Sequence, residues 1–186
     1  MNKKLMAALC GSAALGLALS GCGDDGSDEV DSYARKVCDQ VQPQLKKITD
    51  ANQSITSTAA DGKPADIKKA DSAAFQQISD AYAAMSDSVE KAGTPPVDNG
   101  EKIQTDAVKE LDATSKAYAD LKKAVDKLDT KDQGKFADGL KGVADELDAV
   151  NKVGDDAIKK LQSGEIGTAM SKQAGCKRPT TSPSAT

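Results

Sequence analysis

The chain has 186 residues, with 25 lysines plus arginines against 29 aspartates plus glutamates, four cysteines, no tryptophan and no histidine. The absence of histidine excludes Ser-His-Asp and Cys-His catalysis, histidine-ligated metal sites and imidazole proton transfer. A net charge of −4, with only three tyrosines and two phenylalanines, argues against nucleic-acid binding. No cofactor or metal is expected.

Residues 1–21 have the pattern of a cleaved secretory signal. Lys3 and Lys4 form a short positive start, and an uncharged run of Leu, Ala, Met and Gly extends from Leu5 to Leu19. This run is too short to span a bilayer comfortably but suits the apolar region of a signal peptide. The segment is therefore predicted to be removed and to form no part of the fold.

The next residues, Leu19-Ser20-Gly21-Cys22, resemble the lipobox of bacterial lipoproteins, where signal peptidase II cuts before a diacylated cysteine. The resemblance implies that Cys22 becomes the mature N-terminus and carries a lipid. Two acyl chains anchor a protein stably, so we expect attachment to the outer face of the cell membrane. The alternative is an ordinary secretory signal followed by an incidental cysteine. Residues 22–32, which are mostly polar and acidic, are predicted to form a flexible tether.

Four cysteines have three different expected fates. Cys10 lies in the discarded signal and Cys22 is the lipidation site, which leaves Cys38 and Cys176. Two remaining thiols outside the cytoplasm are expected to form one disulfide. The alternative is two free thiols, one of them reactive. No C-x-x-C motif indicates redox chemistry.

Residues 33–176 are predicted to fold as an all-α domain. Apolar residues recur at steps of three, four or seven, which is the spacing of one helix face, and the alternation typical of strands is absent. Four such runs are present: Val30, Val37, Val41, Leu45, Ile48 and Ile55; Ile67, Phe75, Ile78, Tyr82, Met85 and Val89; Ile103, Ala107, Leu111, Tyr118, Leu121, Val125 and Leu128; Phe136, Leu140, Val143, Leu147, Val150, Ala157 and Leu161.

Short breaks separate these runs. The first precedes Pro64, which suits the first turn of a helix, and the second is the Gly- and Pro-rich segment 93–100. Residues 128–132 offer Asp or Thr caps for a tight third turn. Short connections favour antiparallel neighbours, so we expect an up-down-up-down four-helix bundle. A short helix over 165–174 and a disordered Ser/Thr/Pro tail at 177–186 complete the predicted architecture.

Two features conflict with long regular helices. Pro43 falls inside the first run and removes a backbone hydrogen bond, so a kink or break near Asp39–Gln42 is expected. The fourth run contains several glycines, each of which weakens a helix by about 1 kcal/mol relative to alanine. They face either solvent or a closely approaching neighbour: Gly134, Gly139, Gly142 and Gly154.

No catalytic motif emerges from the sequence. The Gly134–Gly139 spacing of a phosphate loop lacks the Lys-Ser/Thr that must follow it and succeeds a helix rather than a strand. The aromatic residues are interpreted as core, with a ligand cavity as the alternative. Lysine pairs at 46–47, 68–69, 122–123 and 159–160 are interpreted as solvated faces diluted by nearby aspartates.

The signal, the lipobox, the Asp/Lys/Ala-rich helices and the Ser/Thr/Pro tail together resemble small secreted lipoproteins of actinobacteria, a group of mostly unassigned function. The leading hypothesis is a non-enzymatic helical module that binds an envelope protein or a cell-wall component. Val97, in the longest loop, is the candidate contact residue. The alternatives are a carrier or sensor for a small apolar ligand and, third, a hydrolase with an unrecognised carboxylate site.

Overall fold

The computed structural model describes residues 25–161 and 164–177, and within 151–161 the backbone alone. This part of the chain contains five α-helices, one 3-10 helix and no strand, which confirms the all-α class. The helices are α1 (Asp25–Asp61), α2 (Pro64–Ala92), α3 (Gly100–Asp126), α4 (Gln133–Leu161), α5 (Gly164–Lys172) and the 3-10 helix η1 (Ala174–Cys176). The predicted signal, the lipobox, Cys22 and residues 178–186 of the tail lie outside the described residues.

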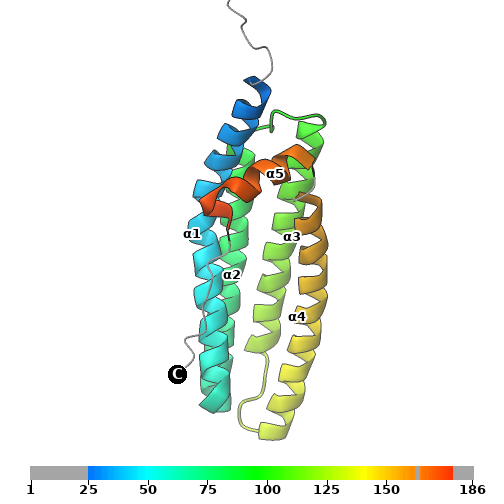
Figure 1. The fold of residues 1–186 in the computed structure, drawn as a ribbon. Coiled ribbons are helices and arrows are strands. Elements are labelled where there is room, and N and C mark those ends of the chain that lie inside the picture. Colours follow the sequence, from blue (N-terminus) through cyan, green and yellow to red (C-terminus); the bar gives the residue numbers. More distant parts are fainter. Residues whose placement is uncertain (1–24, 162–163, 178–186) are drawn as a thin grey trace, which may run out of the picture.

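Each long helix packs against the next one in the chain. α1 contacts α2, α2 contacts α3, and α3 contacts α4, while α5 and η1 pack against α1. Figure 1 shows the four long helices side by side, with α5 crossing them near one end. We call this the proximal end, and the opposite end, where α1 turns into α2 and α3 into α4, the distal end.

The main hydrophobic core draws on all four long helices. Its apolar side chains follow the predicted helix faces, and half-buried residues such as Ile48, Tyr82 and Leu147 pack against it. Ile78 and Val125 are fully buried in it, and Leu121 is only 1% exposed. The buried members are Ala51, Ala74, Phe75, Ile78, Tyr118, Leu121, Val125 and Val143.

The connections form where the sequence predicts breaks. Pro64 is the first residue of α2, and α2 ends at Ala92, followed by Gly93, whose φ of 86° suits glycine. α3 begins after Asn99, which adopts the left-handed conformation. Asp132 caps the start of α4, where its side chain accepts a hydrogen bond from the backbone N–H of Lys135 at 3.1 Å. Local turn chemistry thus sets the helix boundaries.

The start of α1 differs from the prediction. Residues 25–32, assigned to the flexible tether, are helical, and α1 begins at Asp25. The reason is packing: Val30 and Ala34 are buried and contact Ile166 of α5, which lies far along the chain. The helix therefore extends through an acidic segment because its apolar side is covered at the proximal end.

Of the kink or break predicted near Asp39–Gln42, the break is wrong, since α1 is continuous from Asp25 to Asp61 with Pro43 inside it. Proline cannot donate the hydrogen bond that would reach the carbonyl of Asp39. Both Pro43 and Asp39 are exposed, so that carbonyl lies where water can reach it, and the helix continues through Pro43.

The glycines of α4 serve different purposes. A β-carbon on Gly139 would overlap the side chain of Leu128, so this glycine permits a close approach to the preceding turn. A β-carbon on Gly142 would meet nothing within 4 Å, so this position faces open space. Gly154 lies outside the residues whose side chains are described.

Candidate functional site

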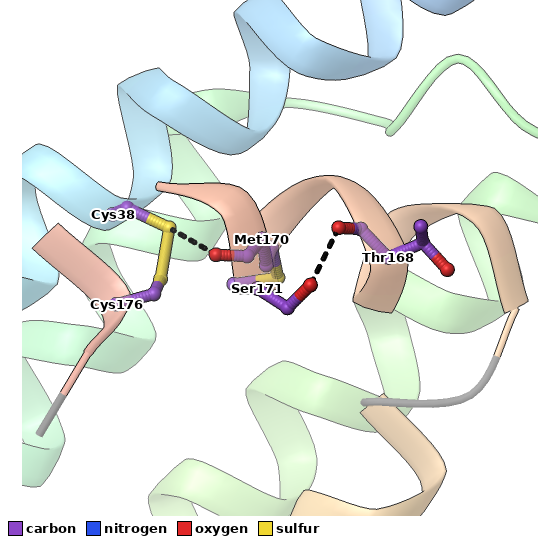
Figure 2. Close-up of a disulfide and its surroundings, with 5 residues drawn as sticks. All are labelled: Cys38, Thr168, Met170, Ser171 and Cys176. Carbon is purple, nitrogen blue, oxygen red and sulfur yellow. Dashed lines mark hydrogen bonds between the residues drawn. A yellow bond between two sulfur atoms is a disulfide. The ribbon is translucent and has the colours of Figure 1, made fainter. Parts of the chain in front are cut away.

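The predicted disulfide forms at the proximal side of the molecule. Cys38 of α1 is bonded to Cys176 of η1, with 4.8 Å between their α-carbons. Figure 2 shows this bond together with Met170 of α5, whose carbonyl oxygen lies 4.0 Å from the sulfur of Cys38. A disulfide sulfur carries no proton, so this contact is a packing contact rather than a hydrogen bond. The bond fixes η1 on α1 just beyond α5.

Gly175 permits this close attachment of η1 to α1. The sequence analysis does not single out this glycine. A β-carbon at this position would lie 2.6 Å from the carbonyl oxygen of Cys38, closer than the two atoms can approach. Any larger residue at 175 would therefore push η1 away from α1. The glycine immediately before a disulfide cysteine is the signal that points to such a close contact.

A second apolar cluster lies under α5 at the proximal end. Val30 and Ala34 of α1 pack against Ile166 and Ala169 of α5, with Val97 and Ile103 at the edge. Val97 is half-buried in this cluster, whereas the sequence suggested a side chain exposed at a loop tip. Its contacts within the chain leave only part of it available to a partner.

The aromatic residues of α2 and α3 lie in the main core, as the helical spacing predicts. The ring of Tyr118 stacks on Tyr82 at a centroid distance of 5.7 Å and meets Phe75 at 6.0 Å. Burial, together with the neighbouring Tyr82, raises the pKa of Tyr118 to about 12. These rings fill the space between the helices and leave Tyr118 neutral at physiological pH.

A depression on the outer side of α2 and α3 brings together lysines that are distant in the sequence. It has a volume of about 490 Å³, is open to solvent and lies at the distal end. Lys68 and Lys69 of α2 and Lys122 of α3 all line it. We call it the lysine depression; its lining also includes Ala65, Ser72, Ala73, Gln76, Asp126 and Thr130. The sequence analysis interprets these lysines as solvated faces and does not predict that three of them line one depression.

Hydrogen bonds fix the polar groups of the lysine depression. The Lys68 ammonium donates to the carbonyl oxygen of Leu128, just past the end of α3, at 3.0 Å. The Asp126 carboxylate accepts from Lys122 at 2.7 Å and from the Ser72 hydroxyl at 2.6 Å. These two bonds, led by Lys122, hold the pKa of Asp126 below its usual value. Three cations thus share the depression with one carboxylate that stays ionised.

A buried carboxylate lies nearby on α2. Asp71 is only 6% exposed, and its Oδ1 atom has no hydrogen-bond partner among the described residues. Burial raises the pKa of this carboxyl group above its usual 3.8. A buried polar group without a partner destabilises the folded state, so Asp71 is a local weakness in α2.

Replacing Asp71 with alanine is expected to stabilise the protein by about 1–3 kcal/mol at pH 7. A folded-state pKa raised above 3.8 means that the wild-type protein loses stability as the pH rises from 3.8 through the folded-state value. The advantage of the variant should therefore be largest at neutral pH and smaller near pH 4. Urea unfolding of the wild-type protein and the variant between pH 4 and 8 measures this difference in stability. The Asp71→Asn variant keeps a polar group but removes the charge, so it distinguishes the two contributions. A pH-independent difference would contradict this assignment.

No family model matches the chain, and no curated protein or solved structure is significantly similar to it. Within residues 25–161 and 164–177, no helix is both long and apolar enough to cross a bilayer. The same residues contain no group of three or more Cys, Asp or Glu side chains arranged to hold a metal ion.

Proposed function

We propose that this chain is an extracytoplasmic lipoprotein, anchored to the outer face of the cell membrane through Cys22, whose helical body binds an envelope component without catalysis. The observation that carries the proposal is the Cys38–Cys176 disulfide, because such bonds persist in oxidising compartments outside the cytoplasm. The Leu19-Ser20-Gly21-Cys22 sequence supports the lipid anchor by its resemblance to a lipobox.

The proposal includes an up-down-up-down four-helix bundle for α1 to α4. Its support is the sequential packing of the helices, the short connections between them and the core that all four share. In this arrangement α1, with 37 residues, is about 55 Å long. Its first residue, Asp25, follows Cys22 by three positions, which limits the extended connection to about 10 Å. The proximal end would then lie close to the membrane and the distal end would project away from it.

A binding role is favoured over the alternatives by the surface chemistry. The lysine depression, of about 490 Å³, and a second depression of about 430 Å³ lined by residues of α1 and α5 are open and have charged side chains in their lining. An apolar ligand requires an enclosed apolar cavity instead. Burial raises the pKa of the Asp71 carboxyl group, but this side chain is buried and lines neither depression. A hydrolase of the kind considered requires two carboxyl groups with different pKa values in one cleft.

Substituting Cys22 with alanine is expected to release the protein from membranes or to leave it as an unprocessed precursor. The reason is that the thioether-linked lipid and the cleavage that follows both require the cysteine sulfur. Cell fractionation with immunoblotting measures the location, and the apparent mass reports cleavage. Cys10→Ala is the matched control, because it removes a cysteine from the signal segment and should leave retention unchanged. Normal cleavage and membrane retention of the Cys22→Ala protein would contradict the lipid anchor.

The binding role is tested in the same cells by cross-linking intact envelopes. The wild-type protein should give a reproducible cross-linked species, and the released Cys22→Ala protein should give less of it. A purified protein that turns over a substrate, at a rate abolished by one Asp or Glu substitution, would instead establish an enzyme.

A further inference from the structure

The lysine depression is a local excess of positive charge on a chain in which acidic residues predominate. Lys68, Lys69 and Lys122 line it together with one carboxylate, that of Asp126, although the whole chain has 29 acidic against 25 basic residues. α2 begins at Pro64 and α3 ends at Asp126 at this same place, so the two helix dipoles oppose each other and the excess positive charge comes from the lysine side chains. An anionic group would find complementary charge here.

The lysine ammonium groups retain donors for such a ligand. Each ammonium has three N–H donors, and Lys68 and Lys122 are held in place by Leu128 and Asp126 respectively. Lys69 is exposed and has no ion-pair partner within the described part of the chain. Two positioned cations and one unpaired cation therefore border the same open space.

The shape of the depression favours a segment of a longer chain over a small enclosed ligand. Its volume of about 490 Å³ is open to solvent, and its apolar lining consists of Ala65, Ala73 and lysine methylene groups. No aromatic side chain lines it, and no wall closes over it. A polymer that carries repeated charges can lie across such a surface and place one anionic group among the lysines.

The location of the depression indicates which polymer could reach it. This step depends on the proposed function: with the anchor at Cys22, the distal end would lie about 55 Å from the proximal end and face away from lipid headgroups. We propose that the lysine depression binds a phosphate or carboxylate group of an anionic polysaccharide of the cell envelope. Lys69 and Lys122 contact the anion, and Lys68 positions the rim by its bond to Leu128.

The test compares two double variants of the full-length processed protein in uncharged detergent. Lys69→Gln with Lys122→Gln changes the depression. Lys109→Gln with Lys102→Gln is the matched control, because Lys109 is also exposed and Lys102 pairs with Asp106 four residues on, as Lys122 does with Asp126. Lys102 and Lys122 are twenty positions apart on α3, or about 30 Å. Both variants lose the same charge, and thermal melting checks that both fold.

Calorimetric titration with polyphosphate and with polygalacturonate measures binding, and the preferred polymer distinguishes a phosphate from a carboxylate ligand. The depression variant should lose at least about tenfold in affinity for the preferred polymer, and the control less than about twofold. Equal losses in both variants, wild-type binding by the depression variant, or tighter binding to polyglutamate than to either polymer would overturn the proposal. Normal membrane retention alongside any of these results would leave the lipid anchor in place and refute the site alone.

Discussion

Replacement of Cys176 with serine is expected to lower the free energy of unfolding by about 4–5 kcal/mol. The Cys38–Cys176 bond spans 138 positions, and cross-links that close long loops remove the most conformational entropy from the unfolded chain. The loss should also loosen the contact of η1 with α1, where Gly175 lies against the backbone of Cys38, whereas α5 keeps its apolar contacts with Val30 and Ala34. Urea unfolding followed by circular dichroism measures the change.

Reduction of the wild-type protein supplies the control for this substitution. A thiol reductant should destabilise the wild-type protein by the same amount and leave the Cys176→Ser protein unchanged. Equal stability of the oxidised wild type and the variant would show that the cross-link contributes nothing to the folded state.

The second large effect is expected in the main core. Ile78 is completely buried among residues of the four long helices, so Ile78→Ala should cost about 2–5 kcal/mol through lost burial and the cavity left behind. Ile67→Ala is the matched control on the same helix, since Ile67 is only half-buried near the start of α2. Its cost should be clearly smaller. Chemical unfolding of both variants measures the two values, and similar costs would contradict the position of the core.

The helices were predictable because their determinants are local. The recurrence of apolar residues at helical steps identifies each long helix, and Pro64, Gly93 and Asp132 mark ends that the structure shows at the same places. The disulfide was predictable by elimination, since the predicted signal and lipobox assign other fates to Cys10 and Cys22. None of these inferences requires knowledge of which helices contact each other.

The remaining features depend on contacts between distant segments. The acidic composition of residues 25–32 favours a tether, and this composition is all that the local sequence offers. The helix α5, which covers their apolar side, is more than 130 positions away in the chain. The lysine depression requires the register between α2 and α3, which places Lys68 beside Leu128 and Ser72 beside Asp126, the partner of Lys122. Nothing in the local sequence around Asp71 indicates that it is buried, unlike the many exposed aspartates of these helices.

The Cys38–Cys176 bond turns most of the described chain into a covalent ring. A protease that cuts the connection at 93–99 or at 127–132 therefore opens the ring without separating it into two molecules. Both pieces would stay attached to residue 38, and through it to any anchor that lies upstream at Cys22. A protein cut at one of these two connections would keep both pieces on such an anchor until the disulfide was reduced, whereas a cut between residues 22 and 38 would release it.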